Sequence, residues 1–366
     1  MRIHIVTDRF TVGGGIEHIY QLVKGIKGID FAVFAEPGNA AGKFAELDNV
    51  EIFPGGYDPG YVLAGKPDLV HIHHLRPLFF FFKRTASAPG IPIIFTAHGL
   101  HIHKYEFSGR FSDKIKYTLR FFLEKMILKK PDKVIAVSKE DQRFLQEKYR
   151  LKNTTYLTNG IDFTGVRAIR QSKEELRKEL NFPAGAFLFV TVARFDFQKG
   201  YDILLKAISL IKDRLAQADR EVRFLFVGGG SEFDRMKEYS RELSVSQYIS
   251  FLGERDDVYK IVKAADLFLL SSRWEGLPIV LLETGLLKTP VLATDTYGNR
   301  EILAGGNGIL CRNEDPADLA EKIAQVLSGK FDLEQCARKL YLEVENNYNL
   351  PKMLAGLEEL YRSFQL

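Results

Sequence analysis

Cysteine is scarce in this chain of 366 residues, which contains only Cys311 and Cys336. Two cysteines without metal-ligand spacing suit a reducing compartment, exclude a disulfide framework and argue against structural zinc. The apolar runs stay well short of the roughly 18 residues that a membrane span needs. The first residues, MRIHIVTD, become polar too early for a secretory signal, and low-complexity tracts are absent. We therefore expect a soluble, cytoplasmic globular protein.

Strong net charge is lacking as well. The formal charge is +4, from 51 basic and 47 acidic side chains, which disfavours nucleic acid as a partner. The basic residues are nonetheless concentrated: residues 101–133 hold nine Lys/Arg against four acids, interleaved with aromatic residues, and residues 76–84 read RPLFFFFKR. This pattern suits peripheral contact with the inner face of an anionic membrane, or with a lipid-linked substrate. The alternative is an amphipathic helix pair with core aromatic residues and a solvated lysine face.

Two nucleotide-binding signatures are missing. The glycines at positions 13–15 are not followed by Lys-Ser/Thr, which excludes a Walker-type loop. A G-x-G-x-x-G motif with a ribose-binding acid about 20 residues later is also missing, which makes a Rossmann dehydrogenase a weak alternative.

Strands and helices nevertheless alternate along the chain, twice over. The expected strands are 2–8, 30–35, 69–73, 93–97, 133–137 and 154–157 in the first block, and 186–193, 223–227, 248–252, 267–271 and 291–293 in the second. The expected helices are 16–26, 113–129, 139–149, 172–180, 201–215, 231–243, 258–264 and 351–364. Such alternation is typical of parallel sheets covered by helices. We therefore expect two doubly wound, Rossmann-like α/β domains, 1–165 and 166–345, followed by a final helix in 346–366.

Charged residues and glycines follow the strands of the second block. Arg194 and Lys199 come after strand 186–193, and a forked guanidinium and a mobile ammonium at this spacing can clamp a diphosphate. A pair of exposed loop cations is the alternative. Gly229 lies in a run of three glycines after strand 223–227, which permits close approach of the backbone to a ligand. Ligands of open parallel sheets bind beyond the carboxyl ends of the strands, so both loops are candidates for a binding site.

The segment RWEGLPIVLLE carries two carboxylates, Glu275 in a Gly/Pro turn and Glu283 inside an apolar helix. Pro278 suits the first turn of this helix, and a helix start offers unpaired N–H groups to a phosphate or to hydroxyls near Gly276 and Leu277. Glu283 comes five residues after Pro278 and would lie roughly 8 Å farther along the helix axis than Pro278. That is about the offset between the sugar and ribose ends of a nucleotide sugar. Two unrelated carboxylates, one in a surface turn and one in a helix, are the alternative.

The first block has candidates of its own. Gly14 and Gly15 open the first helix, where backbone amides can contact a phosphate or an acceptor, and Glu17 lies just inside it. Histidines gather after two strands: His71, His73 and His74, then His98, His101 and His103. Alternation puts the side chains at 71 and 73 on one face of a strand, and no carboxylate or cysteine completes a ligand set, so no metal is expected. His98, beside a glycine at a strand end, is the better candidate for touching a substrate hydroxyl.

Six motifs, in this order, resemble those of the retaining glycosyltransferases of family four. They are Gly-Gly-Gly-x-Glu at 13–17, Thr-Ala-His-Gly at 96–99, Asn-Gly-Ile-Asp at 159–162, Arg-x4-Lys at 194–199, the glycine run at 228–230 and Glu-Gly-Leu-Pro-x4-Glu at 275–283. The resemblance covers nearly the whole chain. It implies the GT-B architecture: two Rossmann-like domains that face a cleft, the first mostly binding the acceptor and the second the nucleotide sugar, with the last helix crossing back to the first domain.

The resemblance also implies roles for individual residues. The catalytic set would be Glu275 at the hydroxyls of the donor sugar, Arg194 and Lys199 at the diphosphate, and His98 at the sugar. Glu283 would hold the ribose, and the backbone around Arg255 would read the base. The further donor-binding candidates are Gly14, Gly15, Gly229, Gly276, Leu277 and Pro278, and the acceptor candidates are Glu17 and His73. Leu277 stands where the family usually has an aromatic residue, which leaves the identity of the sugar open.

The expected reaction moves a sugar, with retention of its configuration, from a UDP- or GDP-linked donor to a glycan or lipid-linked acceptor. No cofactor or metal is expected, because positive side chains and helix dipoles can offset the charge on the leaving group. Two alternatives would use the same nucleotide cradle. One is an epimerase of the same fold, and the other is a catalytically silent module that binds nucleotide sugars.

Overall fold

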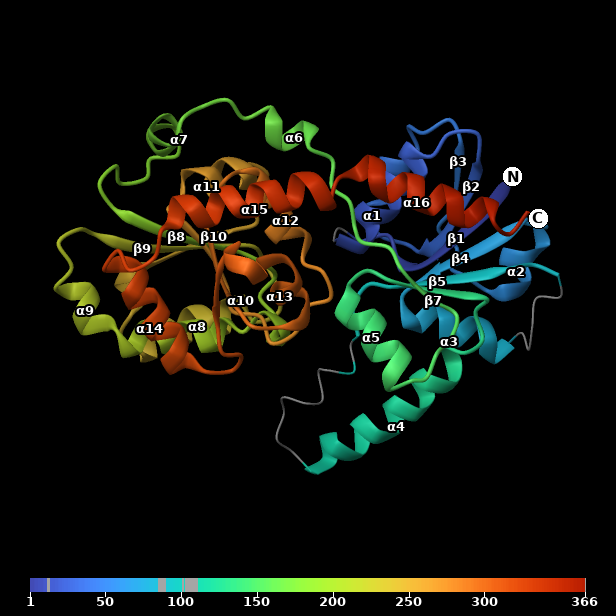
Figure 1. Ribbon diagram of the computed structural model, residues 1–366, viewed down its shortest axis with the longest axis horizontal. Coiled ribbons are helices and arrows are strands. Elements are labelled where there is room, and N and C mark those ends of the chain that lie inside the picture. Colours follow the sequence, from blue (N-terminus) through green and yellow to red (C-terminus); the bar gives the residue numbers. More distant parts are fainter. Residues whose placement is uncertain (12–13, 85–89, 101, 103–110, 366) are drawn as a thin grey trace. The chain divides into compact units, whose positions relative to one another are not determined.

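The chain forms two compact units in the computed structural model, each built on one parallel sheet (Figure 1). Unit 1 comprises Met1–Asp162 together with Tyr348–Leu366, and unit 2 comprises Phe163–Asn347. The structure describes all residues except 12–13, 85–89, 101, 103–110 and 366. Gly13, His101 and His103, which belong to the glycine and histidine patterns of the sequence, therefore lie outside the described residues.

Seven parallel strands form the sheet of unit 1, in the order β3-β2-β1-β4-β5-β6-β7. They are β1 Arg2–Arg9, β2 Asp30–Glu36, β3 Val50–Phe53, β4 Leu69–His73, β5 Ile93–Ala97, β6 Lys133–Ala136 and β7 Thr154–Tyr156. The central strand β1 pairs with β2 on one side and with β4 on the other, where Ile5 lies opposite His71. The strand order therefore reverses between β1 and β4, which is the switch point of a doubly wound sheet.

Helices cover both faces of this sheet, because its strands are apolar on both sides. They are α1 Gly14–Gly25, α2 Pro59–Ala64, α3 Leu75–Arg84, α4 Phe111–Ile127, α5 Lys139–Glu147 and α16 Leu350–Arg362. Ile3 and Ile5 share a core cluster with residues of α1 and α16, whereas Val70 and Ile72 belong to a second cluster with residues of α3 and α5.

The last helix, α16, belongs to unit 1 although unit 2 precedes it in the chain. It packs against α1, where a Cβ on Gly25 would lie 2.2 Å from Leu354. The hydroxyl of Tyr361 lies 2.7 Å from Nδ1 of His71, and the other ring nitrogen of His71 lies 2.7 Å from the hydroxyl of Thr96. A hydrogen-bonded chain of buried side chains thus ties α16 to the middle of the sheet.

Six parallel strands form the sheet of unit 2, in the order β10-β9-β8-β11-β12-β13. They are β8 Phe187–Val192, β9 Val222–Val227, β10 Ile249–Gly253, β11 Leu267–Leu270, β12 Val291–Thr294 and β13 Ile309–Cys311. The helices are α6 Thr164–Arg167, α7 Lys173–Glu179, α8 Tyr201–Leu210, α9 Lys212–Ala216, α10 Phe233–Glu242, α11 Val258–Ala264, α12 Ile279–Leu286, α13 Tyr297–Leu303, α14 Pro316–Leu327 and α15 Leu333–Asn347. Here the order reverses between β8 and β11, so the loops after these two strands flank the switch point.

The predicted strands and helices are present, but several of the observed helices and two of the observed strands were not predicted. Strands β3 and β13 were not predicted, because edge strands of four and three residues are too short to show a period. The helix predicted over 201–215 divides into α8 and α9 at Ile211, whose φ of −112° is not helical. Among the described residues, no helix is both long and apolar enough to cross a membrane.

The aromatic residues of segment 76–133 divide between core and surface. Phe81 is fully buried, and Tyr117 and Phe121 pack against the same core cluster. Phe79 and Phe122 are 48% and 59% exposed. An amphipathic helix pair, the alternative to membrane contact, therefore explains the aromatic residues that face the core. It does not explain why Phe79 and Phe122 are exposed.

Candidate active site

A part-buried ion pair joins two strand-end loops of unit 2. Lys199 ends a short turn after β8 and Glu275 lies in the loop after β11, with 2.6 Å between Lys199 Nζ and Glu275 Oε1. The two side chains are only 16% and 6% exposed. The hydroxyl of Ser272 donates to the same carboxylate oxygen, also at 2.6 Å. Removing either partner would leave the other charge largely shielded from water without its counter-ion, so the two charges depend on each other.

Arg273, two residues before Glu275, fastens these loops together. Its guanidinium donates to both carboxylate oxygens of Asp202, at 2.9 and 2.8 Å, and pairs with Glu314. It also lies 4.0 Å from the centre of the Phe197 ring. Burial alone would raise the pKa of Asp202, but the hydrogen bonds and charge of Arg273 outweigh it and hold the pKa below its usual value. The rigid guanidinium fork of Arg273 thus connects the loop after β11 to the segment that carries Lys199.

The loop after β11 leads into helix α12, which begins at Ile279. Pro278 precedes the helix as its N-cap residue with an extended ψ of 110°, so the predicted place of Pro278 in the first turn is corrected by one position. Leu277 is buried. The backbone of Gly276 is pressed against α13, where a Cβ on Gly298 would lie 1.9 Å from the Gly276 oxygen. Only glycine at 298 allows this approach of loop and helix.

Glu283 lies farther along α12 and is half-buried. Its Oε1 accepts a hydrogen bond of 2.7 Å from the hydroxyl of Tyr259 on α11. A carboxylate accepts hydrogen bonds through both oxygens, so its chemistry suits a pair of vicinal hydroxyls.

The other cations predicted to bind the donor are more exposed. The side chain of Arg194 is 74% exposed, and its guanidinium lies 3.3 Å from Asp196. Arg255 makes two hydrogen bonds to the carboxylate of Asp257, at 2.8 and 2.6 Å. The structure therefore joins Lys199 and Glu275 directly, while Arg194 and Arg255 each pair with a neighbour in sequence.

The glycine run after β9 brings two loops together. The carbonyl of Gly229 accepts a hydrogen bond of 2.8 Å from the N–H of Phe195. Gly230 has a φ of +144°, and a Cβ there would lie 2.5 Å from the Phe195 oxygen. These glycines therefore have a packing role in the structure, in addition to the donor contact predicted for Gly229.

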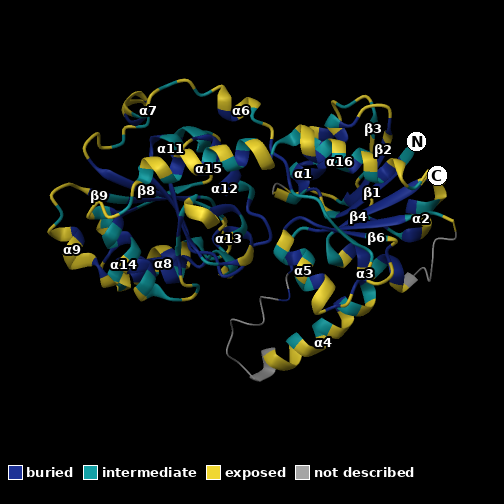
Figure 2. Cartoon of the chain, in the orientation of Figure 1, coloured by how far each residue is buried: buried dark blue, intermediate teal, exposed yellow. Residues whose placement is uncertain are grey.

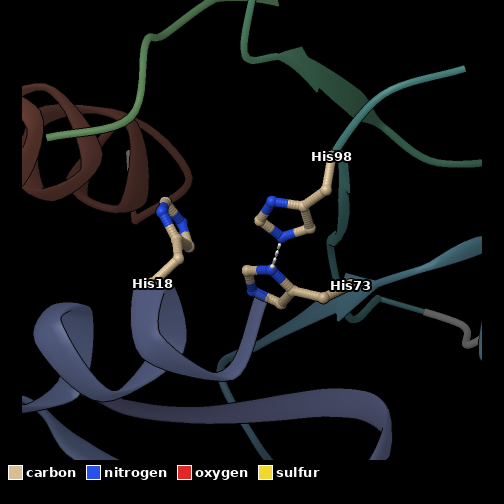
Figure 3. Close-up of side chains that lie close together, drawn as sticks. All are labelled: His18, His73 and His98. Carbon is tan, nitrogen blue, oxygen red and sulfur yellow. Dashed lines mark hydrogen bonds between the residues drawn. The ribbon is translucent and has the colours of Figure 1, made fainter. Parts of the chain in front are cut away.

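Three histidines converge in unit 1 (Figure 3). They are His18 on α1, His73 at the end of β4 and His98 just after β5. Ring nitrogens of the three lie within 4.8 Å of one another, and His73 Nδ1 and His98 Nε2 share a hydrogen bond of 2.8 Å. The ring of His18 stands edge-on to that of His98, with 5.0 Å between their centres.

Burial keeps His18 and His73 neutral. It lowers the pKa of His18 to about 4 and holds the pKa of His73 well below its usual value, and the neighbouring histidines act in the same direction. Nε2 of His73 is buried without a hydrogen-bond partner among the described residues. Because a buried N–H is rarely left unpaired, His73 is best assigned its proton on Nδ1, which it then donates to His98. A neutral His98 would accordingly carry its own N–H on Nδ1.

The same three rings form the one group among the described residues with the spacing to hold a metal ion. Zinc would need imidazole nitrogens at about 2.0–2.1 Å and usually a fourth ligand. His73 and His98 each direct one nitrogen at the other, and within the described part of the chain no carboxylate or cysteine joins the group.

Gly15 of unit 1 lies close to His74, the residue that follows His73 in the chain. Gly14 and Gly15 open α1, and a Cβ on Gly15 would lie 2.9 Å from Nε2 of His74. Glu17 has a side chain that is 43% exposed, and it pairs with Lys43 and accepts a hydrogen bond from Gln21. The two predicted acceptor residues thus differ in exposure. His73 is buried among the histidines, whereas Glu17 makes contacts at the surface.

Four residues with contacts at these places were missed in the sequence: Ser272, Arg273, Tyr259 and His18. Ser272 and Arg273 follow closely after the end of β11, and this position at a strand end could have identified them as candidates. His18 follows Glu17 in the glycine motif. Tyr259 lies on another helix, 24 residues from Glu283, and local sequence gives no sign of their contact.

Two family models match the chain. The model described as Glycosyltransferase Family 4 matches residues 12–164, in unit 1. The model described as Glycosyl transferases group 1 matches residues 172–341, in unit 2. Together they cover most of both units.

Relatives are found over most of the chain as well. An uncharacterized glycosyltransferase of Methanocaldococcus jannaschii is 27% identical over 368 residues, which cover 96% of this chain and 94% of that protein. The UDP-Gal:alpha-D-GlcNAc-diphosphoundecaprenol alpha-1,3-galactosyltransferase of Escherichia coli is 25% identical over 300 residues, covering 81% of this chain and 75% of that enzyme.

Solved structures share the fold. HepE of Anabaena, crystallised with UDP, matches with a TM-score of 0.80 and 21% identity over 99% of this chain and 100% of its own. WaaG, a glycosyltransferase involved in lipopolysaccharide biosynthesis, matches with a TM-score of 0.77 and 17% identity over 98% and 99% of the two chains. With the family models and the relatives, these likenesses show that the chain belongs to the glycosyltransferases of the group 1, family 4 type and has the GT-B fold.

Proposed function

We propose that this glycosyltransferase takes its sugar from a nucleotide diphosphate donor, UDP- or GDP-linked, and transfers it with retention of the anomeric configuration. The observation that carries the proposal is the contact among Lys199, Glu275 and Ser272. It lies at the carboxyl ends of β8 and β11, where the strand order of unit 2 reverses. Ligands of open parallel sheets bind at such a switch point.

Lys199 is proposed to bind the diphosphate. Its ammonium has three donors, and the one directed at Glu275 leaves two for phosphate oxygens. Arg194, whose side chain is largely exposed, can add a forked pair of donors. Both cations would offset the charge that grows on the departing diphosphate, so neither a metal ion nor another cofactor is part of the proposal.

The carboxylates and His98 are proposed to hold hydroxyls. Glu275 would accept from the donor sugar and Glu283 from the ribose, and His98 would contact a sugar hydroxyl with a ring nitrogen. The acceptor would attack from the face on which the diphosphate leaves. Retention on this route needs no protein nucleophile.

The names of similar proteins support a choice of substrates to test first. HepE was crystallised with UDP and with UDP-glucose, and the name of the Escherichia coli relative combines a UDP-linked sugar with a diphosphoundecaprenol-linked acceptor. We therefore propose UDP as the first donor nucleotide to test and a glycan or lipid-linked molecule as the acceptor. We also propose peripheral contact with the inner face of a membrane.

A thermal-shift screen against UDP-, GDP- and ADP-sugars tests the donor. A ligand that binds only the folded state stabilises it by about 2.7 kcal/mol at a concentration of 100 Kd. We expect one nucleotide series to raise the melting temperature. A protein that no sugar nucleotide stabilises would contradict the proposal.

The configuration of the transferred sugar, read by NMR in the product, tests retention. Incubation with the donor alone serves as the control, because an isomerised donor would indicate an epimerase. Tight binding of a donor without transfer to any acceptor would indicate a silent binding module.

A further inference from the structure

Large apolar side chains are exposed on one helix of unit 1, α4. In the described residues, eleven large apolar side chains are exposed, and five of them are on this helix. They are Ile115 at 51%, Leu119 at 61%, Phe122 at 59%, Leu123 at 52% and Met126 at 67% exposure. In Figure 2, most of the described residues of α4 are coloured as exposed or intermediate. We call these five residues the α4 stripe.

The stripe follows one side of the helix. At roughly 100° per residue, its five positions fall within an arc of about 100°. On the opposite side, Tyr117 and Phe121 pack against the core of unit 1, and Glu124, 5% exposed, accepts a hydrogen bond from Tyr149 at 2.9 Å. The α4 stripe therefore faces away from a helix side that is already packed.

Positive charge borders the stripe. Lys114 and Lys116 are exposed near the start of α4, and Lys129 and Lys130 are exposed just beyond its end. The one acid between residues 114 and 130 is Glu124, which is buried and paired with Arg120. Exposed charge along this segment is thus of one sign, beside an apolar surface.

We propose that the α4 stripe docks unit 1 on an anionic lipid bilayer, an inference that rests on the peripheral membrane contact proposed above and names its surface. A helix lying in the interface buries its apolar side at the level of the acyl chains and keeps its lysines among the headgroups. The groups across α4 have the same order. One side of the helix contacts the core of unit 1, the lysines come next at the level of the headgroups, and the α4 stripe lies on the side that would face the acyl chains. Negative headgroups attract the lysines, so binding strength depends on lipid charge and on salt.

Vesicle flotation tests this surface. We expect the protein to float with vesicles that contain phosphatidylglycerol, to float less with vesicles of phosphatidylcholine alone, and to be released as salt is raised. The triple substitution Leu119→Ser, Phe122→Ser and Met126→Ser should lower the bound fraction at least about tenfold, because three large apolar side chains no longer enter the lipid. Lys129→Gln with Lys130→Gln should weaken binding to the anionic vesicles only.

The matched control replaces two exposed leucines of unit 2, Leu210→Ser with Leu342→Ser, and should leave flotation unchanged. A protein that floats with no vesicle, or a triple variant that floats as well as the original chain, would overturn the proposal. So would a concentration-dependent dimer in sedimentation that the triple substitution abolishes without any vesicle binding, since the stripe would then pair with a second copy.

Stabilisation by UDP-sugars, measured without vesicles, separates this inference from the proposed function. The triple variant should be stabilised as much as the original chain. A protein that binds sugar nucleotides but no vesicles would overturn the docking surface alone. One that floats but binds no sugar nucleotide would overturn the proposed function alone.

Discussion

Single side chains of the candidate site have partners within the protein. Lys199 pairs with Glu275, and Glu283 accepts from Tyr259. A ligand at these residues must therefore compete with, or share, an existing partner. Substitution of one partner should change both the ligand contact and the orientation of the group left behind.

Replacement of Lys199 by alanine should reduce turnover by about 100-fold or more, because the diphosphate loses a cation aimed at its developing charge. Among the described residues, the Ser272 hydroxyl then remains as the hydrogen-bond partner of the buried Glu275 carboxylate. Steady-state kinetics with the identified donor measure the effect. Lys237→Ala, at an exposed position on α10, is the control and should keep full activity. Full activity in the Lys199 variant would rule out its role at the diphosphate.

Tyr259→Phe should act through Glu283. The substitution removes one hydrogen bond, worth about 0.5–1.5 kcal/mol, and weakens the restraint on the orientation of the carboxylate. We expect KM for the donor to rise up to about tenfold while kcat changes little. Tyr248→Phe, which removes a weaker hydroxyl contact of 3.3 Å to the Lys212 carbonyl in the same unit, is the matched control. A fall in kcat at unchanged KM would assign Tyr259 a different role.

Helices and strands were easier to predict than the contacts between their ends. The strand LVHIH (β4) and the strand LFLL (β11) are short apolar runs between turn residues, as expected for strands buried on both faces. The gathering of the loops after β8 and β11 also follows from the parallel sheet. The ion pair of Lys199 with Glu275 does not, because it joins side chains 76 positions apart and depends on the places of Ser272 and Arg273.

Gly298→Ala should disturb the loop between β11 and α12. The new Cβ would lie 1.9 Å from the Gly276 oxygen and 2.6 Å from its carbonyl carbon, and backbone atoms cannot move aside as a side chain can. We expect a loss of about 1–3 kcal/mol in the free energy of unfolding and weaker binding of the donor. Urea denaturation and the thermal-shift screen measure the two effects.

Gly185→Ala is the control for this prediction, because a Cβ at that position of unit 2 would meet nothing within 4 Å. It should leave both stability and donor binding unchanged. Equal behaviour of the two variants would show that the close approach of α13 to the loop has no energetic importance.

Stability of the molecule as a whole should depend on pH through the buried histidines of unit 1. Burial lowers the pKa of His71 to about 3 and of His18 to about 4, so the folded chain binds fewer protons than the unfolded chain, whose histidines titrate near 6.5. Acidification therefore favours unfolding. Each such histidine contributes up to about 1.4 kcal/mol per pH unit below 6.5, and this stability is fully present above that pH.

Denaturant unfolding at several pH values between 7 and 5 measures this slope. His71→Asn should lower the stability at pH 7, because His71 bonds to Tyr361 and Thr96, but should make the dependence on pH shallower. An unfolding free energy that stays constant from pH 7 to pH 5 would contradict the prediction.

The return of α16 to unit 1 sets an order of events during synthesis. Met353, Leu357 and Tyr361 complete a core whose other residues, many of them on β1, β2 and α1, leave the ribosome first. Unit 2 is continuous in sequence and can fold as soon as it has emerged. Unit 1 is therefore synthesised first but completes its core last. The apolar surface that α16 covers stays accessible to chaperones until that helix has been made.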